Sequence, residues 1–334
     1  LAGDAAQAYA DFAASGAKAR AWEGELDDNA DLIVDAILGS GLARDVGGTF
    51  TDAINAINAH SAPVVAIDIP SGIHGESGKR LGTAVEAALT VCFVSLKPGL
   101  FLADGIAATG ILRFDGLGIP QSCRAQADVV MRRIDEKQLH AALPRRRKDA
   151  NKGDFGHVLV VGGGRGMPGA VRLCAEAALR TGAGKVSVAT WPGHADALLA
   201  ACPEIMVHGV EGAEQLLPLL ASADVIAFGP GLGRSPWSED LYQKVAEQSL
   251  PAVWDADALN LLAAKREGSP TASAGSRIIT PHPGEAARLL KRTSRDIQGD
   301  RLASVQSLQH TCGGVAVLKG AASLVATGDA VPMV

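Results

Sequence analysis

The sequence contains few aromatic residues and no long apolar run. Phe, Tyr and Trp together make up only 4% of the 334 residues. No stretch reaches the roughly 18 consecutive apolar residues that a membrane-spanning helix needs, and the first residues do not have the pattern of a secretory signal. We therefore expect a cytoplasmic protein that has no membrane partner.

Positive charge is not in excess, and cysteine is scarce. The net charge is −5 and the pI is near 5.9, which disfavours nucleic acid as the main partner and favours a small molecule. The five cysteines include no C-x-x-C pair. This spacing indicates neither a zinc site nor a disulfide framework.

Glycine and aliphatic residues are abundant, and the chain is long enough for two domains. The sequence contains 39 glycines and 47% hydrophobic residues, a composition that suits α/β layers in which helices pack closely on parallel strands. Strand and helix signals alternate in two stretches. The expected strands are 31–38, 62–69, 89–94 and 110–114 in the first stretch, and 158–161, 186–190, 225–228, 252–254, 277–279 and 315–318 in the second.

The composition changes between the two stretches. Residues 120–150 contain Pro120, Pro144 and the basic run 145–148. We interpret this segment as a linker, and we interpret the basic run as a solvated face rather than a phosphate-binding site. The expected organisation is a first domain over 1–119 and a second over 151–334.

Three polar residues lie at strand ends in the first domain. Asp35 precedes the donor-rich loop 39–45, Asp68 precedes Pro70-Ser71-Gly72, and Lys97 follows the strand at 89–94. The carboxyl ends of parallel strands meet at one edge of a sheet, so these residues are expected to share a crevice. A carboxylate and a lysine can exchange a proton, and carboxylate, hydroxyl and carbonyl oxygens suit a hard cation. A simple capped turn at 68–72 is the alternative.

The second domain has more strand-end candidates. Glycine-rich loops at 162–170 and 229–233 follow two of its strands, and 255–260, 280–285 and 319–323 follow three more. A glycine loop that leads into a helix favours an anion such as a phosphate, although the same loop can serve only tight packing. Each segment could be structural alone. Together they predict a ligand cleft.

The motifs, taken in order, resemble a known family. The opening 151–156, the 162–170 loop and the four later segments resemble the ADP/ATP-dependent NAD(P)H-hydrate dehydratases of the ribokinase-like superfamily. Residues 31–119 resemble the later half of the NAD(P)H-hydrate epimerase domain, and the order of the two is that of the bacterial bifunctional repair enzymes. The resemblance implies an α/β chain, with a partial Rossmann-like domain followed by a ribokinase-like domain that has a mostly parallel sheet.

The resemblance also implies a function and its residues. Hydrated NADH or NADPH would be epimerised by the first domain, and its S form would be dehydrated by the second with ADP or ATP and Mg²⁺, ADP being favoured. Asp68 and Lys97 would be the catalytic pair, and Asp35 with Ser71 would bind K⁺. The hydrate would contact Gly39, Ser40, Gly41, Leu42, Ala43, Arg44, Asp45 and Asp68 in the first domain, and Ala170, Gly233 and His282 in the second. The adenine nucleotide would contact Lys319, Gly320, Ala321, Ala322 and Ser323. A homo-oligomer is also expected, because the family often forms one.

Two family motifs are not found in this sequence. An Asn-Asn-Gly-Gly-Asp segment is expected well before residue 31, and a Gly-x-Gly-Asp segment that supplies the aspartate base is expected after residue 334. Thr327-Gly328-Asp329 follows Lys319 too closely to replace the second motif. We therefore expect the chain to be a fragment that lacks a part of each active site.

Two other functions remain open. A ribokinase-like small-molecule kinase would share the sheet and the nucleotide site, and it would release a phosphorylated product without elimination. A non-catalytic nucleotide-binding protein would show affinity for ADP without turnover.

The missing motifs lead to a prediction about activity. The isolated chain should have little activity in either step, because each site lacks chemical groups that the family uses. The measurement is the recovery of NADH absorbance from the S hydrate with ADP and Mg²⁺, and detectable recovery would contradict the prediction.

Overall fold

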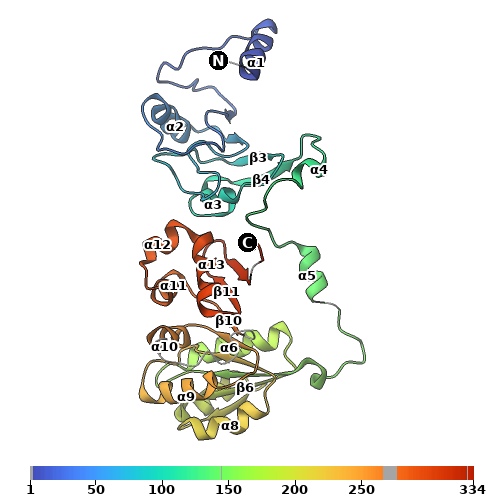
Figure 1. Ribbon diagram of the computed structural model, residues 1–334, viewed down its shortest axis with the longest axis vertical. Coiled ribbons are helices and arrows are strands. Elements are labelled where there is room, and N and C mark those ends of the chain that lie inside the picture. The colour runs from blue at the N-terminus through green and yellow to red at the C-terminus, as the bar shows by residue number, and fades with distance from the viewer. Residues whose placement is uncertain (1–2, 144, 266–276, 329) are drawn as a thin grey trace. The chain divides into compact units, whose positions relative to one another are not determined.

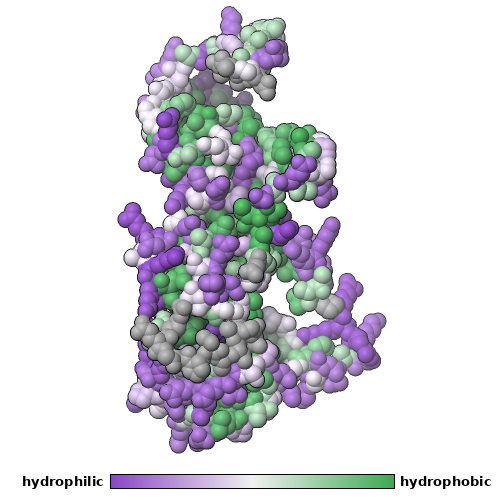
Figure 2. Space-filling model, viewed as in Figure 1, coloured by the Kyte–Doolittle hydropathy of each residue, from purple (hydrophilic) through white to green (hydrophobic). Residues whose placement is uncertain are grey.

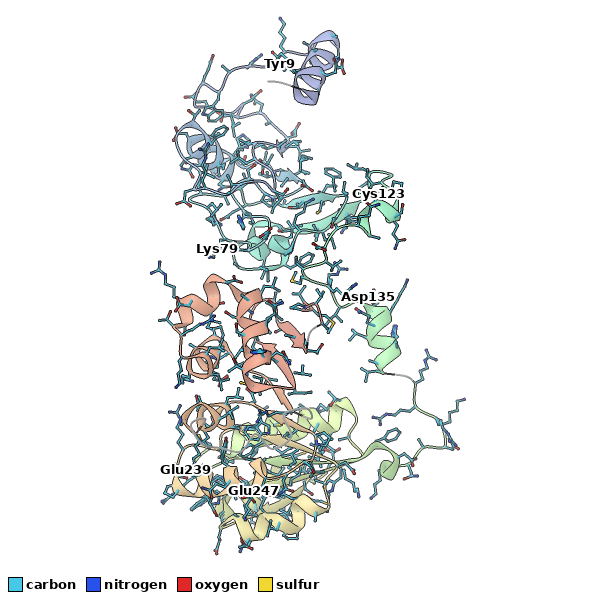
Figure 3. The ribbon with its side chains drawn as sticks, in the orientation of Figure 1. Tyr9, Lys79, Cys123, Asp135, Glu239 and Glu247 are labelled. Atoms are coloured by element: carbon cyan, nitrogen blue, oxygen red, sulfur yellow. The ribbon has the colours of Figure 1, made fainter. Side chains whose placement is uncertain are left out.

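The computed structural model describes residues 3–143, 145–265, 277–328 and 330–334. The chain forms two compact units, Leu1–Gln126 and Ala127–Val334 (Figure 1). The second unit includes part of the expected linker. Arg132 pairs with Met333, and Ile134 N donates to Val334 O at 2.8 Å. Asp135 then caps the N-terminus of the helix that follows by accepting from Gln138 N (Figure 3).

The first unit is built on a four-stranded sheet in which all neighbouring strands are parallel and follow chain order, β1-β2-β3-β4. Its elements are α1 (Asp4–Ala14), β1 (Ile33–Asp35), α2 (Thr49–Ala59), β2 (Val64–Ile67), β3 (Leu89–Phe93), the 3-10 helix η1 (Pro98–Phe101), α3 (Gly105–Ala108), β4 (Ile111–Asp115) and α4 (Gln121–Arg124). The four strands match the expected ones. β1 is shorter than expected, because the Asp35 carboxylate accepts from Ile37 N and turns the chain.

The two faces of this sheet differ in their covering. On one face, Ile54 and Ile57 of α2 are spaced by three residues and pack against Ile33 and Val64. On the other face, the register aligns Val34, Val65, Leu89 and Ile111 in one row across the four strands. Val34 is 57% exposed and Ile111 is 56% exposed, and apolar residues also reach the visible surface of this unit in Figure 2. Parallel sheets usually have both faces covered.

The second unit contains an eight-stranded sheet in the order β12-β11-β10-β9-β8-β5-β6-β7, in which only β12 is antiparallel to its neighbour. Its strands are β5 (His157–Val161), β6 (Lys185–Thr190), β7 (Met206–Gly209), β8 (Val225–Phe228), β9 (Ala252–Trp254), β10 (Arg277–Ile279), β11 (Val315–Leu318) and β12 (Leu324–Thr327). Its helices are α5 (Glu136–Ala142), η2 (Lys152–Phe155), α6 (Pro168–Thr181), η3 (Pro192–His194), α7 (Ala195–Ala201), α8 (Ala213–Ala221), α9 (Pro236–Ala246), α10 (Asp257–Lys265), α11 (Pro283–Leu290), α12 (Ser294–Gly299) and α13 (Arg301–Cys312).

Sequence patterns predict six of these strands and miss β7 and β12. Both lie at sheet edges, where a strand needs less apolar surface, and β7 exposes Met206 to 41%. β12 ends at Thr327, so the rejected Thr327-Gly328-Asp329 motif begins at a strand end. Asp329 itself lies outside the described residues.

The core of the second unit places rigid rings beneath the ends of two central strands. Phe228 and Trp254 pack edge to face with their centroids 5.3 Å apart, and Tyr242 lies 5.5 Å from Trp254. Phe228 directly precedes Gly229, and Trp254 directly precedes Asp255. Buried aromatic pairs of this kind are rigid and strongly packed, so they fix the positions from which both loops leave the sheet.

The 151–156 motif lies at the amino end of β5, opposite the 162–170 loop. There Asn151 caps a 3-10 turn, and Gly184 N and Lys185 N donate to Phe155 O and Gly156 O. The preceding basic run is exposed at all four positions, and Arg146 also makes contacts within the unit. Arg146 donates to Gly182 O at 2.5 Å, and its guanidinium lies 3.7 Å from the centroid of the Phe155 ring. In the described part of the chain, every helix is too short or too polar to traverse a bilayer.

Gly229 is expected to tolerate no side chain. Its φ is +114°, and a Cβ would lie 2.0 Å from Asp255 O and 2.6 Å from the Ala258 Cβ. Gly229→Ala should lower the free energy of unfolding by about 2–4 kcal/mol, because strain and overlap add. Gly169→Ala is the matched control, since nothing lies within 4 Å of its Cβ position, and it should raise stability by about 0.5 kcal/mol. Urea unfolding followed by circular dichroism measures both, and equal stabilities of the two variants would contradict the packing described.

Candidate active site

In the first unit, Asp68 and Lys97 form an ion pair after β2 and β3. Lys97 Nζ donates to Asp68 Oδ1 and also to Phe93 O at 2.9 Å. Asp68 has a positive φ of 72°, and its Oδ1 accepts from Phe93 N at 3.0 Å. A left-handed conformation outside glycine is uncommon and is enriched at functional sites. The expected proton-transfer pair is therefore in direct contact.

A buried thiol lies beside this ion pair. Cys92 Sγ is 3.7 Å from Lys97 Nζ. Burial raises the pKa of the Cys92 thiol, and the charge of Lys97 acts in the opposite direction. The thiol is thus uncharged and lines the site without acting as a nucleophile.

The side chains of Asp35 and Ser71 are also hydrogen-bonded, and Ser71 lies three residues after Asp68 in the chain. Ser71 Oγ donates to Asp35 Oδ1 at 2.6 Å, and Ser71 N donates to Asp35 Oδ2 at 2.8 Å. Leu38 O lies 3.2 Å from the same hydroxyl. Both side chains are 1% exposed. A carboxylate, a hydroxyl and a carbonyl oxygen thus converge at a single point.

The 39–45 loop is mostly exposed and runs next to the segment that carries Ser71. A Cβ on Gly75 would lie 2.9 Å from Ser40 O, so the two backbones approach closely. Leu42 is half-buried, and the other loop residues, including Arg44 and Asp45, are open to solvent. An exposed loop beside a buried polar pair can contact a ligand.

In the second unit, the two glycine loops are bonded to each other. Gly163 N donates to Pro230 O at 2.9 Å, and Gly164 N donates to Gly231 O at 2.7 Å. A Cβ on Gly162 would lie 2.3 Å from Pro230 O, so the approach requires glycine. β5 and β8 are neighbours from which the chain proceeds in opposite directions across the sheet, and a crevice forms at such a switch point.

The side chains of Thr190 and His194 form hydrogen bonds with the backbone of the loop that follows β5. Thr190 Oγ1 donates to Gly163 O at 2.8 Å, and Gly166 N donates to His194 Nε2 at 3.3 Å. Both side chains are buried. Sequence reasoning missed them, although both lie at the carboxyl end of β6.

The contacts around Ala170 and Gly233 join the β8 loop to α6. A Cβ on Gly231 would lie 2.9 Å from the Ala170 Cβ, and one on Gly233 would lie 3.3 Å from Met167 Cε. Gly233 N donates to Asp257 Oδ2 at 2.8 Å. The contacts therefore place Ala170 and Gly233, two residues expected to bind the hydrate, on the same pair of joined segments.

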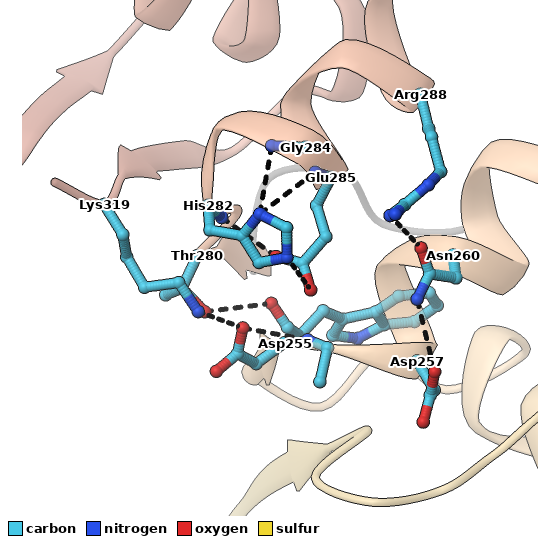
Figure 4. Close-up of polar contacts among 11 residues, drawn as sticks. Asp255, Asp257, Asn260, Thr280, His282, Gly284, Glu285, Arg288 and Lys319 are labelled. Carbon is cyan, nitrogen blue, oxygen red and sulfur yellow. Dashed lines mark hydrogen bonds and ion pairs between the residues drawn. The ribbon is translucent and has the colours of Figure 1, made fainter. Parts of the chain in front are cut away.

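Lys319 is held at the cleft by a carboxylate after β9. Its Nζ donates to Asp255 Oδ1 at 2.6 Å, and its backbone N donates to Pro281 O at 2.9 Å (Figure 4). Asp255 also helps burial raise the pKa of Cys174, on α6, to about 11. Such an influence requires α6 to lie near Asp255.

His282 caps the next helix. Its Nδ1 accepts from Gly284 N at 3.0 Å and from Glu285 N at 3.4 Å, while its Nε2 lies 3.4 Å from Glu285 Oε1. A second cation is nearby on α11, where Arg288 Nη1 donates to Asn260 Oδ1 at 2.6 Å (Figure 4). Sequence reasoning did not single out Arg288, because a lone exposed arginine on a helix gives no signal.

The five predicted strand-end segments of the second unit follow five adjacent strands, β5, β8, β9, β10 and β11.

The sequence matches two family models. The model for NAD(P)H-hydrate dehydratase matches residues 158–333, and the model for the YjeF-related protein N-terminus matches residues 1–99. The chain is 46% identical over 298 residues to the bifunctional NAD(P)H-hydrate repair enzyme Nnr of Coxiella burnetii, covering 88% of this chain and 59% of that protein. It is 44% identical to the Escherichia coli Nnr enzyme, covering 90% and 57%. The chain thus spans less than two thirds of the length of these relatives.

Solved structures share the fold of the second unit. A ribokinase-like superfamily protein from Enterococcus faecalis superposes with a TM-score of 0.55 at 30% identity, covering 62% of this chain and 72% of that one. The ADP/ATP-dependent NAD(P)H-hydrate dehydratase from Bacillus subtilis, co-crystallised with ATP and Mg²⁺, superposes with a TM-score of 0.53 at 26% identity, covering 60% and 71%. The dehydratase model covers more than half of this chain, and the strand-end segments of the second unit lie within the matched region. On this evidence the chain belongs to the NAD(P)H-hydrate dehydratase family.

Proposed function

We propose that this protein repairs NADH and NADPH that have become hydrated on the nicotinamide ring. The first unit would interconvert the R and S hydrates, and the second would dehydrate the S hydrate at the expense of ADP. The observation that carries the proposal is the set of contacts in the second unit that brings both glycine loops, His282 and Lys319 to the ends of adjacent strands. The names of the relatives support both steps.

The chemistry of dehydration explains the need for a nucleotide. Hydroxide is a poor leaving group, so transfer of a phosphoryl group from ADP to the ring hydroxyl would give a phosphate that leaves readily, with AMP as the other product. Phosphoryl transfer depends on positioning and on positive charge more than on covalent help from the protein. Lys319, at the end of β11, is the group of this chain that would supply the positive charge.

His282 has a defined role in this scheme. Because Nδ1 accepts two backbone N–H groups, the proton of the neutral ring lies on Nε2. The ring therefore carries its donor at Nε2, 3.4 Å from Glu285 Oε1, and cannot serve as a base while it caps α11. We assign it to binding the hydrate, together with Ala170 and Gly233.

The nucleotide is proposed to bind at 319–323. Gly320, Ala321 and Ser323 are exposed, and Ala322 and Lys319 are half-buried. The Asp255 carboxylate holds the Lys319 ammonium in place. Mg²⁺ would accompany the nucleotide and offset the charge of its phosphates, consistent with the ATP/Mg²⁺ in the Bacillus subtilis structure.

The first unit is proposed to act through Asp68 and Lys97. Their direct contact lets one group accept a proton as the other returns one, and the exposed 39–45 loop would hold the hydrate beside them. Asp35, Ser71 and Leu38 O present the oxygen ligands that suit K⁺. When bound, the ion would supply a fixed positive charge near the phosphates of the hydrate.

Two substitutions should separate the two ligands of the second unit. His282→Asn keeps an oxygen that can cap α11 but loses the Nε2 donor, so affinity for the S-NADPH hydrate should fall about tenfold. Lys319→Ala should weaken ADP binding about tenfold or more and leave the hydrate unaffected. Calorimetric titration with ADP and Mg²⁺, and with the hydrate in the absence of ADP, measures both affinities.

His282→Ala controls for the cap, because it should also lower the free energy of unfolding by about 1 kcal/mol, whereas His282→Asn should not. Absence of binding by either ligand would contradict the proposal, as would equal effects of both substitutions on both ligands. Accumulation of a phosphorylated hydrate without NADPH would identify a kinase instead.

A further inference from the structure

Arg301 is a buried cation beneath the 319–323 loop. It is the first residue of α13 and is 8% exposed. Its Nη2 lies 2.8 Å from Ala322 O and 3.3 Å from both Leu318 O and Lys319 O, and its Nη1 donates to Gln298 Oε1 at 2.8 Å. One guanidinium thus joins the two ends of the loop that connects β11 to β12.

These contacts fix the direction of three peptide groups. In a trans peptide, the C=O and the following N–H point in opposite directions. The carbonyls of residues 318, 319 and 322 face Arg301, so the N–H groups of Lys319, Gly320 and Ser323 face away from it. Lys319 N donates to Pro281 O. Within the described ranges, the N–H groups of Gly320 and Ser323 make no hydrogen bond, and both residues are exposed.

Gly320 packs directly against the Arg301 guanidinium. A Cβ at this position would lie 2.5 Å from Arg301 Nη2 and 2.9 Å from its Cζ. Any other residue would push the loop away from Arg301 or displace the guanidinium. The φ of Gly320 does not require glycine, so the close approach is the reason for glycine here.

The charge of Arg301 is compensated only by dipoles. Among the described residues, no carboxylate lies within ion-pair distance of it, and burial lowers the pKa of the guanidinium. A buried charge without an ionic partner is costly to maintain. Its positive potential acts at the loop surface, where screening by the protein interior is weak.

We infer that Arg301 is a positioning residue that orders the 319–323 loop, so that the N–H groups of Gly320 and Ser323 are presented to a phosphate of the adenine nucleotide. This inference rests on the proposed function for the identity of the ligand. Arg301 itself does not touch the nucleotide. Unpaired backbone N–H groups that point to one side of a loop favour an anion.

Arg301→Lys tests the inference because it keeps the charge but loses the planar fork, in which Nη1 binds Gln298 while Nη2 reaches the loop carbonyls. In the full chain, we expect ADP affinity in the presence of Mg²⁺ to fall at least about tenfold, while affinity for the S-NADPH hydrate stays unchanged. Hydrogen exchange of the Lys319 amide, which donates to Pro281 O, should quicken. Arg295→Lys on α12 is the matched control, since Arg295 is exposed and should change neither affinity nor exchange.

Gly320→Ala is a second variant, in which residue 301 is still arginine. It provides a test if Arg301→Lys does not fold. It should weaken ADP binding to a similar extent, and the double variant should lose little more, because both act through one contact. Unchanged ADP affinity and unchanged exchange in Arg301→Lys would overturn the inference, as would equal losses for ADP and the hydrate. If the unaltered chain binds no ADP, the proposed function fails, and amide exchange alone then decides whether Arg301 orders the loop.

Discussion

Two backbone hydrogen bonds, from Gly163 to Pro230 and from Gly164 to Gly231, join the loops after β5 and β8. The rest of the second-unit site depends on them. They form only because no side chain stands between the loops, as the 2.3 Å from the Gly162 Cβ position to Pro230 O makes plain. Once joined, the loops fix the start of α6 and bring Gly233 within reach of Asp257. Because backbone hydrogen bonds join the two loops, their relative position has little freedom to change.

Buried polar groups support both walls of this cleft. Thr190 and His194 hold the carbonyl and the amide of the β5 loop, and Arg301 holds three carbonyls of the loop after β11. These side chains satisfy backbone groups that lie outside regular structure, where an unpaired buried group would be destabilising. Ordering the loops before a ligand arrives reduces the entropy lost on binding.

The sequence predicts the central strands and the strand-end residues because both follow local rules. In the second unit, apolar runs of four residues predict β5 and β8. In the first unit, the parallel order of β1, β2 and β3 brings Asp68 to Lys97 and Asp35 to Ser71. The edge strand β7 escapes prediction because little of its surface is buried, and β12 escapes although Leu324 and Ala326 are buried. Arg301 and His194 escape because their partners are backbone carbonyls and amides distant in sequence, which no local pattern encodes. The same reason hides the contact of Arg146 with Gly182 and Phe155, which makes part of the basic run structural.

Three of the four tryptophans lie in the second unit. Trp254 precedes Asp255 and lies under the Arg277 guanidinium, 5.0 Å from its ring centroid. Trp191 donates its backbone N–H to Gly163 O and packs against Trp237 with centroids 5.7 Å apart. Indole emission responds to nearby charge and to the rigidity of its surroundings. These three tryptophans therefore give the second unit an intrinsic optical reporter.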